Sequence, residues 1–298
     1  MRAAAGWIAV CLVFCVFGAV MVVGCAPTDL RTGGLEERMR PSTEQEMQGR
    51  ALLQRAAEVQ GVERWTQLHS YRLRFRDLWQ GLMPTLLNPW PEDDVWVDVY
   101  FRSNSFDARA DFLEGELKGQ SWGLQSWRSY VIDAQGQTHF VDNDDIAFIL
   151  PAIHYLQEFS FRALDHTVVA YMGTETIDGV KWERVMVTWG LLAPNLEHDQ
   201  YVAYIHPESG RVEKIQYTVR DIMRIMTGTI HFSDFREVDG LWLPFTQAIT
   251  LDPDGDPDTE FAHRITVQEM VLDPVPVAFF RQDQALGQVG NAKVHPRE

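Results

Sequence analysis

The sequence predicts an α+β protein built on one large curved antiparallel sheet, with helices plugging its concave face. From Tyr71 onward, apolar and polar residues alternate in successive segments that turn signals such as Asp-Gly separate, a pattern typical of an antiparallel meander. A sheet of about 11–12 strands must curl or close. One helical segment precedes the sheet and another interrupts it, so we expect an unclosed half-barrel whose concave face the helices cover.

Residues 1–24 predict a signal peptide. Arg2 is the only charged side chain before Asp29, and the apolar run ends in Val-Val-Gly-Cys. This ending resembles the bacterial lipobox, in which a small residue precedes a cysteine that receives fatty acyl chains such as palmitate and becomes the mature N-terminus. We therefore predict lipidation at Cys25. The alternative is an uncleaved membrane-spanning anchor, and both interpretations place the following residues outside the cytoplasm on a membrane.

Cysteine content and charge exclude several classes of protein. All three cysteines lie at or before Cys25, so the body of the chain has no disulfide, no cysteine metal site and no thiol nucleophile. The net charge of −16 argues against nucleic-acid binding, which needs a basic surface, and against electrostatic docking on anionic lipid. Any membrane contact is therefore expected to be apolar or covalent.

The segment after the apolar run contains Pro, Gly, Thr and mixed charges with no apolar period. Residues 25–42 therefore predict the lipidated cysteine followed by a flexible tether. A helix is expected next, over residues 43–61, because apolar residues recur there at helical spacing. Thr43 and Glu46 fit a capping box at its start, and Gly61 suits its C-terminal end.

The strands are expected where the apolar period is two. They span residues 71–79, 95–101, 106–112, 120–132, 137–141, 167–175, 180–189, 199–206, 211–220, 226–236, 241–251 and 259–272. No Pro-, Gly- or Ser-rich linker longer than a turn separates them, so we expect a single half-barrel domain over residues 43–280 and a disordered tail over residues 281–298.

An insertion at residues 144–165 interrupts the strand pattern. It is apolar nearly all round, which predicts one or two short buried helices, and Asp144 and Asp145 suit a helix start. Pro151 lacks a backbone N–H, so we expect a break there that lets residues 146–161 hinge as a lid over a cavity. The alternative is a plug that only fills the core.

Two hairpins carry a resemblance to a known family. Residues 207–210, Pro-Glu-Ser-Gly, resemble a D-P-x-T-G turn, although His206 stands where Asp is common, and residues 232–244 resemble a hairpin with Asp-Gly at its turn and Pro244 at its edge. Over about residues 45–272 the chain resembles the LolA/LolB-like outer-membrane lipoprotein-carrier superfamily, in its branch of bacterial lipoproteins rather than the carriers themselves. The resemblance implies an apolar cavity that takes acyl chains. Ala26 follows the predicted lipidated cysteine, and in some bacterial lipoproteins this position favours the outer membrane, so we expect a lipoprotein of the cell envelope at the outer membrane, facing the periplasm.

Aromatic and aliphatic side chains on the strands and the insertion are the candidates for lining such a cavity. Ordinary core packing is the alternative for each of them. The candidates are Trp79, Trp96, Trp182, Phe148, Ile149, Ile153, Tyr155, Leu156 and Phe159.

No catalytic or metal-binding pattern stands out. Aspartates occupy every second position from Asp252 to Asp258, but Pro257 and His263 stand where a calcium loop needs Gly and Glu, so a solvated acidic turn is favoured. The histidines form no H-E-x-x-H pair, and no G-x-S-x-G occurs. We therefore expect no catalytic residues, no metal and no cofactor.

These observations favour a non-enzymatic, lipid-anchored extracytoplasmic protein that binds an apolar ligand, either a lipid or a lipoprotein acyl chain. Binding would be passive, driven by burial of apolar surface. The alternative is an envelope assembly lipoprotein with a filled core, which contacts a protein partner through its surface. An envelope hydrolase is a third interpretation, which the absence of any triad spacing disfavours.

Overall fold

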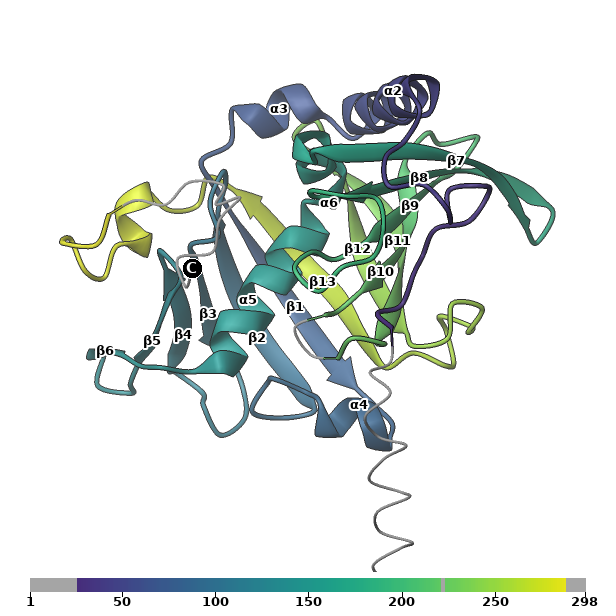
Figure 1. Cartoon of the computed structure of the whole chain (residues 1–298). Coiled ribbons are helices and arrows are strands. Elements are labelled where there is room, and N and C mark those ends of the chain that lie inside the picture. Colours follow the sequence, from purple (N-terminus) through teal and green to yellow (C-terminus); the bar gives the residue numbers. More distant parts are fainter. Residues whose placement is uncertain (1–25, 221–222, 288–298) are drawn as a thin grey trace, which may run out of the picture.

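The computed structural model describes residues 26–220 and 223–287, so the predicted signal peptide and Cys25 lie outside the described residues. A single antiparallel sheet of 13 strands dominates it, in the order β6-β5-β4-β3-β2-β1-β13-β12-β11-β10-β9-β8-β7 (Figure 1). The strands are β1 (Ser70–Trp79), β2 (Asp94–Arg102), β3 (Ala108–Phe112), β4 (Ser121–Gln125), β5 (Arg128–Ile132), β6 (Thr138–Phe140), β7 (Val168–Ile177), β8 (Val180–Thr188), β9 (Tyr201–Ile205), β10 (Val212–Thr218), β11 (Thr227–Val238), β12 (Leu241–Thr250) and β13 (His263–Leu272).

The chain starts this sheet in its middle. It runs as a meander from β1 to the edge strand β6, crosses to the opposite edge at β7, and returns to pair β13 with β1. Because β6 and β7 remain edges, the sheet is not closed, and the predicted α+β half-barrel is confirmed. The crossing segment holds the helices of the apolar insertion, which therefore lie over the concave face (Figure 1).

The sheet has 13 strands rather than 11–12 because residues 120–132 form two strands and not one. Ser126 and Trp127 make the turn between β4 and β5, with φ of 50° and 64°. Two successive left-handed residues are what a tight hairpin requires, but they are usually Asn and Gly. The sequence therefore offers no turn signal at this point.

The helices are α2 (Thr43–Val59), α3 (Val62–Thr66), α4 (Leu82–Leu86), α5 (Asp144–Gln157), α6 (Phe159–Arg162) and the short 3₁₀ turns η1 (Ala163–Asp165) and η2 (Val277–Phe280). The capping box of α2 uses Ser42 and Gln45, one residue before the predicted pair. Gly61 follows the end of α2 in the left-handed conformation, as expected. No helix in the described part of the chain is long and apolar enough to cross a membrane.

Helix α5 is continuous through Pro151, so the predicted break at this residue is wrong. The helix ends instead at Gln157, and Glu158 separates it from α6. Its start is capped by Asn143, whose side chain accepts a hydrogen bond of 2.9 Å from the backbone N–H of Ile146. Asp144 and Asp145 occupy the first turn, as expected.

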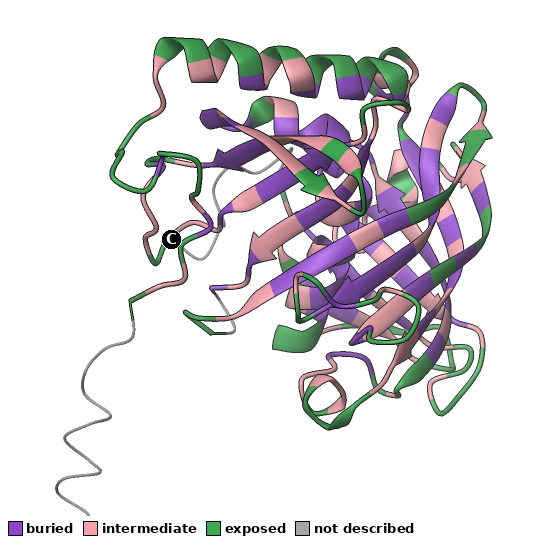
Figure 2. Ribbon diagram, turned by 90° about the vertical axis from the view of Figure 1, so that its right-hand side faces the viewer, coloured by how far each residue is buried: buried purple, intermediate pink, exposed green. Residues whose placement is uncertain are grey.

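Apolar side chains are buried on both faces of the sheet. On the concave face, β1, β2 and β3 pack beneath α5, and β7 to β11 pack beneath α2 and α6. On the outer face, Leu30 and Leu35 are buried against β7, β8 and β9. Two side chains of the segment that we expected to be a flexible tether, Leu30 and Leu35, are therefore packed on the sheet. Figure 2 shows buried positions concentrated in the strands and exposed ones in the turns and on the outer side of α2 at the top.

The first residues of the expected tail also make contacts. The Gln125 side chain at the end of β4 accepts hydrogen bonds from the backbone N–H groups of Gln282 and Asp283, at 2.8 and 3.0 Å. Residues 281–287 are thus held against the β4–β5 hairpin, and residues 288–298 lie outside the described part of the chain.

Candidate ligand-binding cavity

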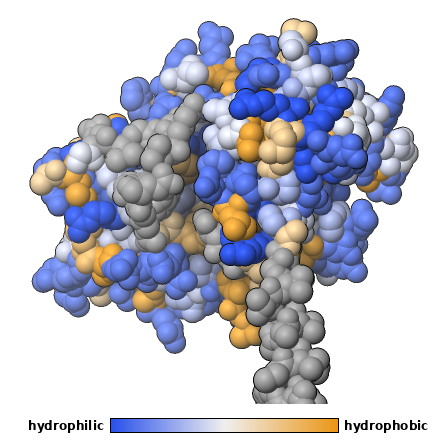
Figure 3. Space-filling model, in the orientation of Figure 1, coloured by the Kyte–Doolittle hydropathy of each residue, from blue (hydrophilic) through white to orange (hydrophobic). Residues whose placement is uncertain are grey.

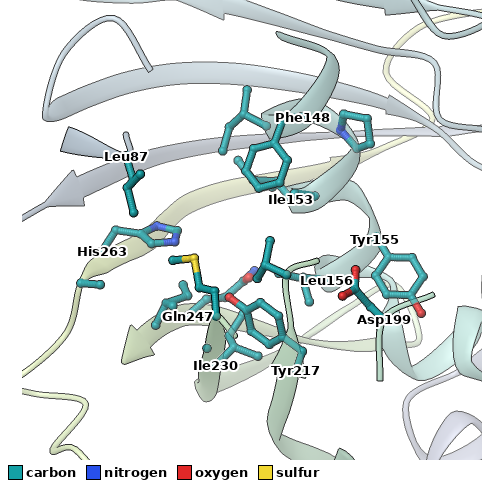
Figure 4. A pocket seen from close by; sticks show the side chains of 18 of the residues that line it. Leu87, Phe148, Ile153, Tyr155, Leu156, Asp199, Tyr217, Ile230, Gln247 and His263 are labelled. Carbon is teal, nitrogen blue, oxygen red and sulfur yellow. The ribbon is translucent and has the colours of Figure 1, made fainter. Parts of the chain in front are cut away.

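A cavity of about 350 Å³ lies between α5 and the concave face of β9 to β13. Phe148, Ile153 and Leu156 of α5 point across it toward side chains of the sheet, among them Tyr217 and Ile230 (Figure 4). Its volume falls within the range of about 300–1,000 Å³ that is usual for ligand pockets. An apolar wall with few polar groups suits an apolar ligand.

Six of the nine predicted residues line this cavity. They are Trp79, Phe148, Ile149, Ile153, Tyr155 and Leu156. Helix α5 therefore has one face in the core and another face at the cavity. Ile146 and Leu150 pack in the core beneath the helix, whereas Phe148 and Leu156 face the cavity. The all-round apolarity of the insertion thus reflects one face in core and another at a cavity.

Three predicted residues lie elsewhere. Phe159 is fully buried behind the cavity wall, with ring centroids 5.9 Å from Tyr155 and 5.7 Å from Tyr201. Trp96 lies on the outer face, because Val95 and Val97 on either side of it belong to the core beneath α5. Trp182 also lies on the outer face, where it packs against the Leu30–Leu35 cluster.

The sequence reasoning missed several lining residues. These are Phe106, Trp127, Tyr201, Tyr217, Gln247 and His263 among others. Tyr217 could have been predicted, because it lies two residues after the buried Ile215 and its side chain therefore points to the same face of β10. Phe106 and Trp127 lie in turns, and only the path of the whole chain brings them to α5.

A buried carboxylate organises the polar end of the cavity. Asp77 on β1 has no exposed surface, and its side chain accepts hydrogen bonds from the indole N–H groups of Trp79 and Trp90 at 3.1 and 2.9 Å. The Nδ1 atom of His263 lies 3.0 Å from the other carboxylate oxygen. The His263 ring stacks on Trp79, with ring centroids 4.1 Å apart and an angle of 6° between the ring planes. These contacts fix the His263 ring at the cavity wall.

A second polar group lies on the sheet side of the cavity. The Gln247 side chain donates to the side-chain oxygen of Gln157, and its own oxygen has no hydrogen-bond partner among the described residues. Gln247 is almost fully buried. A buried acceptor without a partner is costly, so a ligand that brings one N–H or O–H group to this position would be stabilised.

A buried charge network holds the C-terminal end of α5. The Glu158 carboxylate lies 2.5 Å from Nε2 of His154 and accepts from Nε of Arg162 at 2.6 Å and from the Tyr71 hydroxyl at 2.9 Å. A terminal nitrogen of Arg162 donates to the Ser105 carbonyl at 2.9 Å. The Tyr71 side chain of β1, the backbone of the β2–β3 turn at Ser105 and side chains of both helices are thereby joined.

The network determines which groups are charged. Burial alone would raise the pKa of Glu158, but Arg162, His154 and Tyr71 together hold it below its ordinary value. Burial lowers the pKa of His154, although Glu158 opposes this shift. A neutral His154 fits the geometry, because its Nδ1 atom has no partner among the described residues and a proton there would be buried without an acceptor.

The cavity reaches the surface near α4. Pro84 and Leu87 line it and are partly exposed, and Leu251, which follows β12, lines it and is exposed. We call this opening the mouth of the cavity.

The acidic turn between β12 and β13 is stabilised by its own hydrogen bonds. Asp256 accepts from the backbone N–H of Asp258 at 2.8 Å and from the Thr259 hydroxyl at 2.9 Å, and these bonds hold the pKa of Asp256 below its ordinary value. Within residues 26–220 and 223–287, no three His, Cys, Asp or Glu side chains lie close enough together to hold a metal ion.

No protein-family model matches the chain, and no curated protein matches it either. Solved structures do match it. A domain described as an outer-membrane lipoprotein-sorting protein from Vibrio parahaemolyticus is 10% identical, with 79% of this chain and 97% of that domain covered and a TM-score of 0.52. A LolA superfamily protein from Nitrosomonas europaea is 14% identical, covers 78% of this chain and 96% of its own, and has a TM-score of 0.48.

The likeness to the Vibrio domain establishes the fold and no more, given its low identity. It confirms the fold that the resemblance of the hairpins implied.

Proposed function

We propose that the protein is a lipid-anchored lipoprotein of the cell envelope that binds a lipid or an acyl chain in the cavity beneath α5. The apolar cavity between α5 and the sheet is the observation that carries this proposal. The role is passive and non-catalytic. Apolar surface that enters the cavity leaves water, and burial contributes about 25 cal/mol per Å².

The polar groups of the wall favour a ligand with one polar end. His263 is held in place by Asp77, and Gln247 offers an unpaired oxygen. An acyl chain that carries an ester, amide or hydroxyl group could fill the apolar part of the cavity and place that group against His263 or Gln247. A ligand with several charges would not suit this wall.

The anchor is proposed at Cys25, and the protein at the outer membrane facing the periplasm. The motif that ends in Gly24-Cys25 supports lipidation, and the fold that the chain shares with an outer-membrane lipoprotein-sorting domain is consistent with an envelope role. One acyl chain holds a protein only marginally, whereas the three chains usual for such a cysteine hold it firmly.

The fixed ends of α5 suggest how the ligand enters. Asn143 caps the start of the helix and the Glu158 network secures its end, while Pro151 causes no break. We therefore propose α5 as a wall of the cavity and the mouth at Leu251 and Leu87 as the entrance.

Ligand binding is tested on the purified lipoprotein by mass spectrometry of extracted lipid and by titration with a fluorescent fatty acid. Ala152 lines the cavity, so Ala152→Trp should fill it and weaken probe binding by about tenfold or more. Ala51 is exposed on α2, and Ala51→Trp serves as the control. Absence of bound lipid together with no probe binding by the wild type would contradict the proposal and favour an envelope assembly role instead.

A further inference from the structure

Exposed apolar side chains gather around the mouth of the cavity. Leu82, Met83 and Leu86 of α4 are exposed, while Pro84 and Leu87 beside them line the cavity. Figure 3 shows apolar side chains at the lower edge of the molecule, where α4 lies in Figure 1. Helix α4 therefore leaves apolar side chains exposed to solvent beside the entrance of the cavity.

The segments that face α4 across the mouth continue the apolar surface. Met223 and Ile225 in the β10–β11 connection and Leu251 after β12 are exposed, and Met226 lines the cavity. We call the set of exposed residues the mouth rim; it comprises Leu82, Met83, Leu86, Met223, Ile225 and Leu251, which are 41% to 78% exposed. The described residues include 11 large exposed apolar side chains. Because six of them belong to the rim, this exposure is concentrated and not scattered.

The N-terminal segment comes to the same place. The backbone N–H of Thr28 donates to the Arg224 carbonyl at 3.1 Å, and the Thr28 hydroxyl donates to the Ile225 carbonyl at 3.0 Å. The Arg220 guanidinium donates to the Thr28 carbonyl at 2.9 Å. Three residues of chain reach at most about 11 Å, so lipid attached at Cys25 would hold the rim close to the membrane.

We propose that the mouth rim inserts into the bilayer that carries the Cys25 anchor, so that the cavity opens directly onto lipid. This docking rests on the lipid anchor of the proposed function. The rim supplies apolar side chains and the anchor supplies proximity, which together suit the interfacial region of a membrane. A ligand could then pass between bilayer and cavity without crossing water.

Charge indicates which membranes the rim tolerates. The acidic turn that begins with Asp252 and Asp254 directly follows Leu251, and the chain carries a net charge of −16. Because these negative charges outweigh the exposed Arg224 between Met223 and Ile225, anionic lipid gives no net attraction. Insertion should occur in vesicles of phosphatidylcholine alone, and added anionic lipid should not strengthen it.

The absence of cysteine after position 25 permits a direct test. In the acylated lipoprotein the thiol of Cys25 is blocked, so Leu86→Cys or Met47→Cys provides one site for an environment-sensitive fluorophore. Met47 is exposed on α2, at the opposite end of the molecule from α4 (Figure 1). The lipoprotein is reconstituted in phosphatidylcholine vesicles that contain lipids with a quencher in their acyl chains. We expect the label at position 86 to shift to shorter wavelength and to be quenched at least threefold, and the label at position 47 to remain unchanged.

A second variant tests the contribution of the rim. With the label at Ile225→Cys, the substitutions Leu82→Gln and Met83→Gln should lower quenching by about threefold or more, whereas Met47→Gln should not. Equal, weak quenching at positions 86 and 47 would overturn the docking. A label at position 86 that is shielded from lipid quencher but crosslinks to another copy or another protein would also overturn it.

The outcomes separate this inference from the proposed function. Ala152→Trp fills the cavity and leaves the rim intact, so it should keep the quenching at position 86 while it loses fatty-acid binding. Fatty-acid binding without quenching in the wild type would contradict only the docking. Quenching without fatty-acid binding would contradict only the proposal that the cavity binds a lipid or an acyl chain.

Discussion

Tyr71 on β1 donates a hydrogen bond of 2.9 Å to the carboxylate of Glu158, 87 residues further along the chain. Both side chains are buried. β1 lies in the middle of the sheet, where it pairs with β2 and β13, and Glu158 joins α5 to α6. The bond therefore connects the central strand to the end of the helix that forms the cavity wall.

Removal of the Glu158 charge should destabilise the protein strongly. Glu158→Gln removes the carboxylate that pairs with the buried guanidinium of Arg162, and loss of one partner from a buried pair costs about 3–5 kcal/mol. The free energy of unfolding from chemical denaturation measures this loss. Glu114 is exposed and has no ion-pair partner among the described residues, so Glu114→Gln is the control. A loss below about 1 kcal/mol for Glu158→Gln would show that the network adds little.

Stability should also fall as the pH drops. Burial lowers the pKa of His154, and burial together with Lys214 lowers that of His231 to about 4. Below about pH 6.5 the unfolded chain takes up protons on these residues that the folded chain refuses. Glu158 adds to the effect below about pH 4.5, because its pKa is lower in the folded state than in the unfolded state.

Denaturation at a series of pH values measures this dependence. Each histidine should contribute at most about 1.4 kcal/mol per pH unit, and full stability should be present above about pH 7. His231→Gln should flatten the curve between about pH 6.5 and 4, whereas substitution of the exposed His69 should not. A stability that is constant from pH 7 to 5 would contradict the assignment of both histidines as neutral.

Local patterns predicted most of the fold. Alternation and Asp-Gly turns located the strands, because both act within a few residues. Asp178-Gly179 and Asp239-Gly240 have the left-handed conformations that tight hairpins require. The error of one residue at the start of α2 arose because Ser42 with Gln45 and Thr43 with Glu46 both fit a capping box.

The cavity was harder to predict, because it depends on contacts between distant segments. The alternation of side chains along a strand could have placed Trp96 on the outer face, since its neighbours Val95 and Val97 are core residues. The packing of Leu30 and Leu35 on β7 to β9 could not be predicted from a periodic pattern, because this contact involves only two isolated apolar side chains of the segment. Such contacts follow from the path of the chain and not from a local pattern.

Lipidation gives a prediction about processing. Cys25 lies outside the described residues, and the motif before it is the reason to expect acylation. Cys25→Ser should leave an unlipidated precursor that keeps residues 1–24, because serine cannot accept the acyl chains through sulfur. Intact mass and detergent partitioning measure the outcome. A serine variant that is trimmed to the same N-terminus as the wild type would contradict the prediction.

Two phenylalanines in the insertion should respond differently to truncation. Phe159 is fully buried in a packed cluster with Leu53 and Val169, so Phe159→Ala should cost about 3–5 kcal/mol through the new cavity. Phe148 already borders a cavity and is only partly buried. Phe148→Ala removes fewer contacts and should cost less than about 2 kcal/mol.

Ligand binding should show the opposite order. Phe148→Ala enlarges the cavity, so the affinity for a fluorescent fatty acid should change by roughly threefold or more, whereas Phe159→Ala should leave it nearly unchanged under conditions where that variant is folded. Chemical denaturation and probe titration on the same samples measure both effects. Equal losses of stability with no change in probe affinity for either variant would mean that Phe148 packs as core and that the wall of α5 does not contact ligand.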